Sequence, residues 1–279
     1  MLDSQYAVES IPEITIKMSH LPDAAILSCY LFGYETIIIE APKVTSDDIN
    51  KIKQTISHLI GVEIIEENHQ KVVLQCLLKA SAFPPEKVLR REYVLSSSMF
   101  KDAIHSFANI DLSLARSILK RDEEVNRLYF LLVRLLRTLI INPRLSEKLS
   151  VSLIDCLDYR LVATLIENIA DQAVEMAKAT IILHNQELPL GISRSVLEVG
   201  QKFQETYEEV IKAIFSKSEK LLLSAISKRE NALLAIKKLE SDLEKVQSEI
   251  TPTLFAFSSS LRRVFDYFTD MIDLVTPHG

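Results

Sequence analysis

Apolar and polar residues alternate in short segments over residues 1–82. Segments such as ITIKM and ETIIIE have the two-residue period and the β-branched content of strands. Gly33 ends the helix expected between them, and Pro42 closes the second strand. Ser46 is expected to N-cap a helix that Gly61 ends. The expected elements are strands at Ile14–Met18, Glu35–Glu40, Val62–Ile65 and Val72–Leu78 and helices at Pro22–Phe32 and 46–60. This alternation predicts a small α/β domain with a mixed sheet.

A helical period replaces the strand pattern from Phe83 onward. Pro85 suits the first turn of a helix, and Asp111 or Ser113 can cap the next one, which Pro143 ends. The expected helices run over 85–108, 113–141, 146–184, 193–216, 218–250 and 253–275, with a linker at 185–192. The second helix carries a bundle seam at Val125, Leu128, Leu132, Leu135 and Leu139. The third is expected to bury Leu157, Leu161, Leu165, Ile166 and Ile169.

These helices repeat one order twice: a medium helix, a very long one, and a partner that closes the bundle. The period is about a hundred residues, which is too long for a solenoid and indicates a duplicated helix bundle. The predicted fold is mainly α, with two tandem three-helix bundles behind a small α/β domain. The predicted segments are the α/β domain at 1–82, the first bundle at 83–190 and the second bundle at 191–279.

Composition and charge exclude several functional classes. Hydrophobic residues make up 48% of the 279 residues and charged residues 25%, which is typical of a globular protein with a real core. A net charge of -6 gives no basic field for nucleic acid, so no nucleic acid is expected. No apolar run reaches the ~18 residues of a spanning helix, and no secretory signal precedes Ile14. We expect a cytoplasmic protein without membrane insertion, whose three cysteines are buried hydrophobes.

The candidate metal ligands are polar residues that form pairs, spaced four residues apart, on two of the expected helices. Glu167 and Asp171 form one pair, with Glu175 a turn further on, and Asp122 with Asn126 forms the other. Residues four apart lie on one helix face, so two such pairs could hold Fe(III), Mg(II) or Mn(II) through oxygen ligands. The alternative is a solvated polar face balanced by nearby cations, namely Arg121, Arg127 and Lys178. No phosphate loop, nucleophile elbow or His-Glu-x-x-His motif occurs, and no enzyme is expected.

The same segments resemble a known family. RDEEVNRLYFLLVR (Arg121–Arg134) and LVATLIENIADQAVEMA (Leu161–Ala177) are similar to the two marker segments of the PhoU phosphate-uptake regulators, in the same order and on corresponding helices. AILSCYLFGYETIIIE (Ala25–Glu40) and IGVEIIEE (Ile60–Glu67) look like the region before the helices in archaeal members. The resemblance implies paired three-helix bundles, metal clusters in some members, and restraint of phosphate uptake through contact with other proteins.

Carried over residue by residue, the resemblance assigns a metal site to Asp122, Asn126, Glu167 and Asp171. The cofactor itself stays unknown, with iron or another divalent or trivalent metal expected. Asn168 stands where the family has Arg. In the second repeat Leu234 and Arg262 replace acidic partners, so that repeat is expected to hold no metal. Many archaeal relatives also begin with an AbrB-type DNA-binding hairpin, which this chain is expected to lack.

The leading hypothesis is therefore a non-enzymatic regulator of phosphate homeostasis. It would act as a homodimer that binds a phosphate transporter or a phosphate-signalling protein. Two alternatives stay open: a DNA-binding transcriptional regulator, and a di-metal carboxylate enzyme built in a helix bundle. The enzyme is disfavoured because ferritin-like sites use Glu-x-x-His pairs, which this sequence lacks. DNA binding would show itself by a steep loss of affinity with salt.

Overall fold

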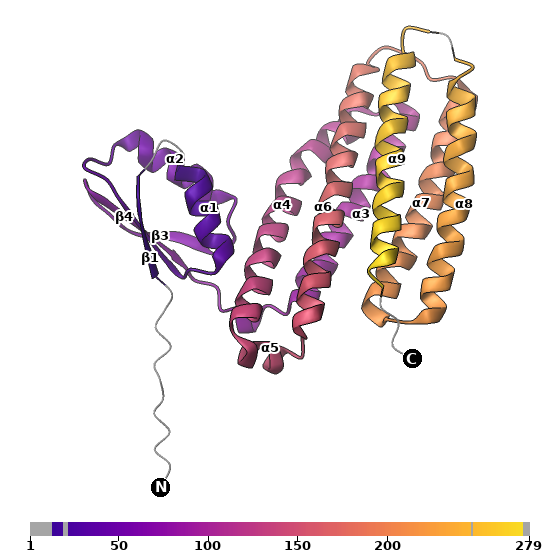
Figure 1. Cartoon of the computed structure of the whole chain (residues 1–279). Coiled ribbons are helices and arrows are strands. Elements are labelled where there is room, and N and C mark those ends of the chain that lie inside the picture. Colours follow the sequence, from indigo (N-terminus) through magenta and orange to yellow (C-terminus); the bar gives the residue numbers. More distant parts are fainter. Residues whose placement is uncertain (1–12, 19–21, 247, 276–279) are drawn as a thin grey trace. The chain divides into compact units, whose positions relative to one another are not determined.

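The structure is a computed structural model that describes residues 13–18, 22–246 and 248–275 (Figure 1). The elements in chain order are β1 Glu13–Lys17, α1 Pro22–Phe32, β2 Thr36–Glu40, α2 Ser46–Ser57, β3 Val62–Glu67, β4 Lys71–Cys76, the 3-10 turn Ala80–Ala82, α3 Pro85–Asn109, α4 Leu112–Ile141, α5 Pro143–Leu149, α6 Leu153–Ile182, α7 Leu190–Ser216, α8 Glu219–Leu243 and α9 Thr251–Asp273. The predicted fold class, helix bundles after a small α/β domain, is confirmed. In the described part of the chain, no helix combines the length and apolarity that crossing a membrane requires.

Two compact units divide the chain. The N-terminal unit takes residues 1–88 and 130–157, and the helical unit takes 89–129 and 158–279. Helices α4 and α6 therefore contribute part of their length to each unit. The three segments predicted from the sequence, 1–82, 83–190 and 191–279, follow the chain instead, and they stay a prediction.

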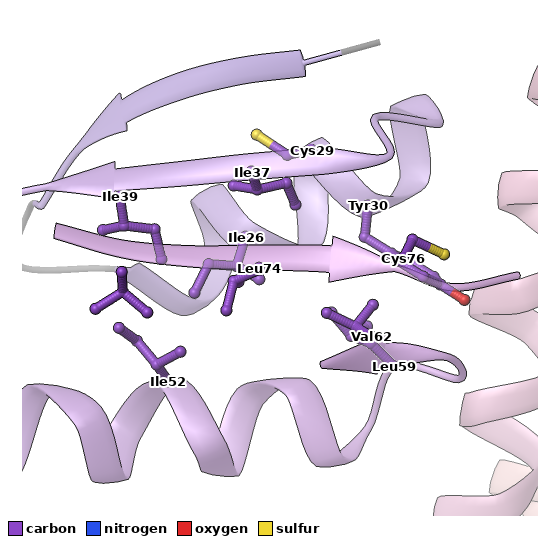
Figure 2. Close-up of a cluster of buried hydrophobic side chains, with 11 residues drawn as sticks. Ile26, Cys29, Tyr30, Ile37, Ile39, Ile52, Leu59, Val62, Leu74 and Cys76 are labelled. Carbon is purple, nitrogen blue, oxygen red and sulfur yellow. The ribbon is translucent and has the colours of Figure 1, made fainter. Parts of the chain in front are cut away.

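The sheet of the N-terminal unit has the order β1-β2-β4-β3. Strands β1 and β2 are parallel, joined through α1, and the other two pairings are antiparallel, which confirms the mixed sheet. Because side chains alternate along a strand, Ile37 and Ile39 of β2 share one face with Val72 and Leu74 of β4. These residues form a buried cluster, to which α1 gives Ile26 and α2 gives Ile52 (Figure 2).

Helix α2 begins at Ser46, the residue expected to cap it, so its N-cap lies one residue earlier than predicted. Thr45, and not Ser46, is the N-cap, because its backbone is extended and its hydroxyl accepts a hydrogen bond from the Asp48 amide. The Asp48 carboxylate accepts in return from the Thr45 amide, at 2.9 Å, which completes a capping box. The helix ends at Ser57, and Gly61 takes a positive φ of 81° in the turn that leads into β3.

A buried arginine holds the end of α1 against α4 within the N-terminal unit. Arg134 is 5% exposed, and its guanidinium donates to the carbonyls of Tyr30 at 2.7 Å, Tyr34 at 2.9 Å and Gly33 at 3.2 Å. The last carbonyls of a helix have no partner inside the helix, and they carry partial negative charge. The guanidinium satisfies these carbonyls and supplies a matching positive charge.

Aromatic stacking joins the two sets of three helices inside the helical unit. Helix α3 of the first set packs rings against the second set: Phe107 stacks on Phe257 of α9 with centroids 3.6 Å apart, and Phe100 stacks on Phe203 of α7 at 6.0 Å. At Gly200 of α7, an added Cβ would lie 2.4 Å from Ile104 of α3, so the missing side chain permits close helix approach. The two sets therefore share one core.

The third expected helix is interrupted. It divides into α5 and α6 because Ser150 adopts a left-handed conformation, with φ of 55°. Its buried face was also predicted wrongly in part: Leu157 is 59% exposed and Leu161 is 51% exposed, whereas Ile166 and Ile169 are fully buried as expected. Small residues take much of the buried face, and they allow the neighbouring helices to pack closely. The buried alanines of α6 are Ala163, Ala170, Ala173, Ala177 and Ala179.

Prolines shift the ends of the helices in the second set. Helix α7 begins at Leu190, directly after Pro189, and α9 begins at Thr251 with Pro252 in its first turn. Proline is favoured in a first turn because its missing N–H has no helical partner there. The fifth expected helix is shorter than predicted, since α8 ends at Leu243. Ser218, in the turn between α7 and α8, is the N-cap of α8. The Ser218 hydroxyl accepts a hydrogen bond from the Leu221 amide.

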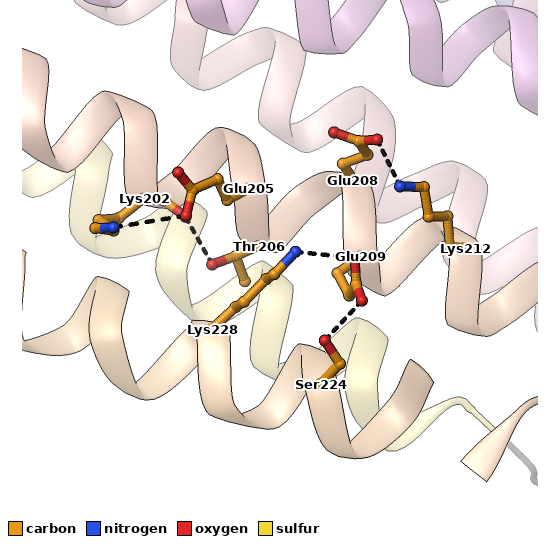
Figure 3. Close-up of polar contacts among 8 residues, drawn as sticks. All are labelled: Lys202, Glu205, Thr206, Glu208, Glu209, Lys212, Ser224 and Lys228. Atoms are coloured by element: carbon orange, nitrogen blue, oxygen red, sulfur yellow. Dashed lines mark hydrogen bonds and ion pairs between the residues drawn. The ribbon is translucent and has the colours of Figure 1, made fainter. Parts of the chain in front are cut away.

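One buried carboxylate fastens α7 to α8. Glu209 of α7 accepts hydrogen bonds from the Ser224 hydroxyl at 2.6 Å and from the Lys228 ammonium at 2.9 Å (Figure 3). These hydrogen bonds lower the pKa of Glu209, the one from Ser224 most strongly. The carboxylate is thus ionised and fully partnered, and it serves helix packing.

Candidate functional site

The four predicted ligands come from two helices of the helical unit. Helix α4 carries Asp122 and Asn126 one turn apart, and the Asn126 amide donates to the Asp122 carboxylate at 3.4 Å. Helix α6 carries Glu167 and Asp171, also one turn apart. Burial, and to a smaller extent the charge of Asp122, raises the pKa of both α6 carboxyls, so the two pairs lie within electrostatic range of each other. We refer to these four residues as the acidic site.

Carboxyls in the acidic site resist ionisation. Burial, together with the charges of Asp171 and Asp122, raises the pKa of Glu167 to about 7. Burial raises the pKa of Asp171 as well, helped by Asp122 and Glu175. The pKa of Asp122 is raised by burial, against an opposing effect of Lys178. Like charges that the nearby protein cations offset only in part are ones that a further cation would stabilise.

Two cations of α6 lie at opposite ends of the acidic site. The Lys178 ammonium pairs with Glu175 at 2.7 Å, which agrees with the neighbour expected from the sequence. Arg160, which the sequence did not single out, lowers the pKa of Glu167 against the larger effects. Its guanidinium lies 5.0 Å from the centre of the Tyr129 ring and donates to the Thr164 hydroxyl. Arg121, expected beside the site, instead pairs with Asp102 at 2.6 Å.

A further carboxyl next to the acidic site was missed. Glu92 of α3 is fully buried, and its pKa is raised well above the ordinary value by burial and by the charge of Glu167. A signal for it exists in the sequence, because Glu92 shares one face of α3 with the apolar residues Leu89 and Met99, which are buried. An acidic residue at such a position is rare unless it has a partner. Glu92 of α3 is thus electrostatically coupled to Glu167 of α6.

The donor atoms suit a hard cation, although they are not gathered around one point. Carboxylate and amide oxygens are the ligands that Mg(II), Mn(II) and Fe(III) take in proteins. Among the residues that the structure describes, no three His, Cys, Asp or Glu side chains are placed as a ligand group. Binding would therefore require the carboxylates to turn toward a shared ion.

The corresponding place in the second repeat contains a protein cation. Arg262 of α9 pairs with Glu240 of α8 at 2.5 Å. Leu234 is 66% exposed on α8, so it contributes no ligand oxygen. The two repeats share their helical order and differ in the chemistry of this position.

Comparisons with known proteins relate this chain to a protein family. The PhoU domain model matches residues 89–180, which span α3, α4 and α6 with all four residues of the acidic site. The crystal structure of PhoU from Pseudomonas aeruginosa is similar in fold, with a TM-score of 0.62 and 20% identity, over 70% of this chain and 95% of that one. A search of curated proteins finds no match. Residues 89–180 of this chain thus match the PhoU domain, and the chain shares the fold of a solved PhoU.

Proposed function

We propose that this chain is a non-enzymatic regulator of phosphate homeostasis that restrains phosphate uptake by binding another protein. The observation that carries the proposal is the PhoU domain match over residues 89–180. The partner class is a phosphate transporter or a phosphate-signalling protein, and the regulator acts in the cytoplasm as a homodimer. The similar fold of a solved PhoU supports the same role.

Metal binding at the acidic site is the second part of the proposal. Asp122, Asn126, Glu167 and Asp171 would hold the ion, which would supply positive charge and fix α4 against α6. The support lies in oxygen donors of the right kind and in carboxyls whose pKa values burial and mutual repulsion raise. The second repeat would hold no ion, because the Arg262 guanidinium already neutralises Glu240.

We propose that the helix bundle catalyses no reaction. Di-metal carboxylate enzymes of this architecture place a Glu-x-x-His pair on each of two helices. Neither α4 nor α6 contains a histidine in its sequence. The oxygen-only donor set favours an ion that has a structural or signalling role.

Capture of partners from the native cells tests the regulatory role. The tagged full chain is recovered from cells grown with ample phosphate and from phosphate-starved cells, and mass spectrometry identifies the bound proteins. We expect a phosphate-transporter subunit or a phosphate-signalling protein to be enriched in one of the two conditions. Recovery of nucleic acid alone, with gel-shift binding that weakens steeply with salt, would favour the DNA-binding alternative.

Elemental analysis tests the metal part separately. The protein is purified without a chelating tag, and its metal content is compared with that of the double variant Glu167→Gln, Asp171→Asn. The double variant keeps the side-chain shapes while it removes two carboxylates, so we expect it to lose the metal. Glu124→Gln is the matched control, since Glu124 lies on α4 and pairs with Arg91 at the surface. Unchanged metal content in the double variant would rule out the assigned site.

A further inference from the structure

Strand β3 forms one edge of the sheet in the N-terminal unit. The order β1-β2-β4-β3 pairs β3 with β4 on one side and places no described strand on its other side. An open strand edge presents a row of backbone N–H and C=O groups that can pair with a further strand. The edge runs over six residues, Val62–Glu67, which is the usual length of a strand. An extended segment could therefore add to the sheet here.

A groove with a volume of about 360 Å³ follows this open edge. Five consecutive residues of β3, 63–67, line the groove, together with Lys53 and Ile56 of α2. Successive side chains of a strand point to opposite faces, so a groove on one face of the sheet would be lined by alternate residues only. Because all five residues line it and no described residue of β4 does, the groove lies alongside the edge. At about 3.3 Å per residue, it extends for about 16 Å.

Isoleucines give the groove an apolar part. Ile56 of α2 and Ile64 of β3 are partly buried, and they pack against the core cluster of the N-terminal unit. Ile65 is the extra residue of a bulge, because the pairing with β4 passes from Ile64 to Glu66, and it is 53% exposed. A strand added along the edge would cover these side chains if it carried a branched apolar residue of its own.

Glutamates give the groove its charge. Glu63, Glu66 and Glu67 line it, against Lys53 as the one cation in its described lining. The Glu66 carboxylate pairs with Lys71 at 3.1 Å. Glu63 and Glu67 are exposed, and neither forms an ion pair with any residue that the structure describes. Two carboxylates are therefore available to cations from another molecule.

The bulge sets the spacing that such cations would need. Glu63 lies opposite Gln75 of β4, and Glu67 lies opposite Val72, so their partners on β4 are three positions apart. Side chains an odd number of positions apart lie on opposite faces of a strand, which places the two carboxylates on opposite faces of the sheet. A strand that adds in the same register would meet both carboxylates with residues three positions apart.

A second copy of this chain is disfavoured as the occupant. Pairing of β3 with β3 would bring the glutamates of one edge against those of the other, and like charges directly opposite each other are destabilising. Charged side chains and bulges on natural edge strands prevent this kind of self-pairing. The same carboxylates attract a segment of opposite charge, so the edge discriminates between the two occupants.

We propose that the open edge of β3 binds an extended basic segment of another protein by strand addition. The segment carries Lys or Arg at two positions three apart, facing Glu63 and Glu67, and a β-branched residue beside Ile64. Main-chain hydrogen bonds hold the segment, and its side chains select it. The inference goes beyond the proposed function, because the edge lies outside the PhoU domain match at 89–180 and does not depend on the metal.

Binding of a defined peptide to the full chain tests the backbone pairing. The probe is fluorescein-labelled Thr-Val-Lys-Thr-Val-Lys-Thr-Val, and fluorescence anisotropy follows its binding. Two isomers carry N-methyl groups on alternate amides, one at the odd positions and the other at the even positions. Alternate amides of a strand point toward its neighbour, so one isomer should bind at least about tenfold more weakly and the other should bind like the parent peptide. Equal binding of the two isomers would overturn strand addition.

A matched pair of double variants tests the role of the carboxylates. Glu63→Gln with Glu67→Gln should weaken binding of the parent peptide about fivefold, as expected for loss of two exposed ion pairs. Glu13→Gln with Glu40→Gln is the control, since it removes two exposed carboxylates from β1 and β2 with the same change in net charge. The control should weaken binding less than about twofold. Equal losses in the two double variants would contradict the assigned ion pairs.

Hydrogen exchange locates the peptide and identifies the occupant. The parent peptide should slow the exchange of β3 amides in the wild type, because those on the open edge would gain a partner. Slower exchange of β3 at higher protein concentration without peptide would make a second copy the occupant and overturn the inference. Lack of peptide binding up to about 1 mM would also overturn it, because even a weak complex is detected there. Neither result would affect partner capture by the PhoU domain.

Discussion

Replacement of Arg134 by alanine is expected to lower the free energy of unfolding of the N-terminal unit by about 3 kcal/mol. Three carbonyls at the end of α1 would lose the guanidinium, although the Tyr30 carbonyl keeps the Gly33 amide as a donor. An unsatisfied buried polar group costs about 1–3 kcal/mol. Release of the guanidinium from a buried position offsets part of that cost. The loss should also free the end of α1 from α4, because these hydrogen bonds join the two elements.

Hydrogen exchange measured by mass spectrometry can locate this effect, and urea unfolding gives its size. Amides of β2 and β4 should exchange faster in Arg134→Ala, since their side chains pack under α1. Arg137→Ala is the matched control, one turn further on, where the guanidinium lies over the exposed Phe32 ring at 4.9 Å. Its cost should stay below about 1 kcal/mol. Equal losses of unfolding free energy in the two variants would show that the hydrogen bonds from Arg134 to the carbonyls do not stabilise the N-terminal unit.

Stability of the metal-free protein is expected to fall as the pH rises from about 5 to about 8. The pKa of Glu167 is raised to about 7 in the folded protein, from an ordinary value of 4.5. The folded state therefore binds more protons than the unfolded state between these two values. The stability that protonated Glu167 contributes is fully present below pH 4.5 and is lost as the pH rises through about 7.

The size of the change is about 2 kcal/mol, because the carboxyl is partly exposed and water screens it. Asp122, Asp171 and Glu92 have raised pKa values too, so their contributions have the same sign. Glu167→Gln should flatten the pH dependence without abolishing it. Urea unfolding at several pH values with a chelator present measures this, and Glu124→Gln should keep the wild-type slope. A Glu167→Gln profile that matches the wild type would show that Glu167 ionises normally.

Periodicity predicted the fold where side chains repeat on one face. The isoleucines of β2 and the leucine seam of α4 follow the periods of a strand and a helix, and both are buried as expected at Ile37, Ile39, Leu132 and Leu139. Breaks set by backbone conformation were missed. Serine is not a residue type that indicates a left-handed φ, so the break at Ser150 could not be predicted and the sequence indicated one helix in place of α5 and α6. Leu157 and Leu161 were predicted to be buried and are exposed, because a single sequence does not reveal which apolar face of a helix other helices cover.

The four-residue spacing along each helix predicted the two residue pairs of the acidic site. Asp122 with Asn126 and Glu167 with Asp171 are visible because residues four apart share a helix face. Arg160 and Glu92 reach the site from seven residues earlier on α6 and from a different helix, so their relation to Glu167 depends on packing between helices. The role of Arg134 likewise could not be predicted from the sequence, because its carbonyl partners lie about a hundred positions away along the chain.

The aromatic stacking between the two helix sets has a consequence for truncation of this chain. A polypeptide that ended at residue 190 would leave the rings of Phe100, Phe107 and Tyr93 facing water, since their partners Phe203, Phe257 and Tyr207 lie beyond that point. Exposed aromatic area of that kind drives association. The first helix set on its own is therefore expected to associate with further copies, and the second set protects it from doing so by covering these rings.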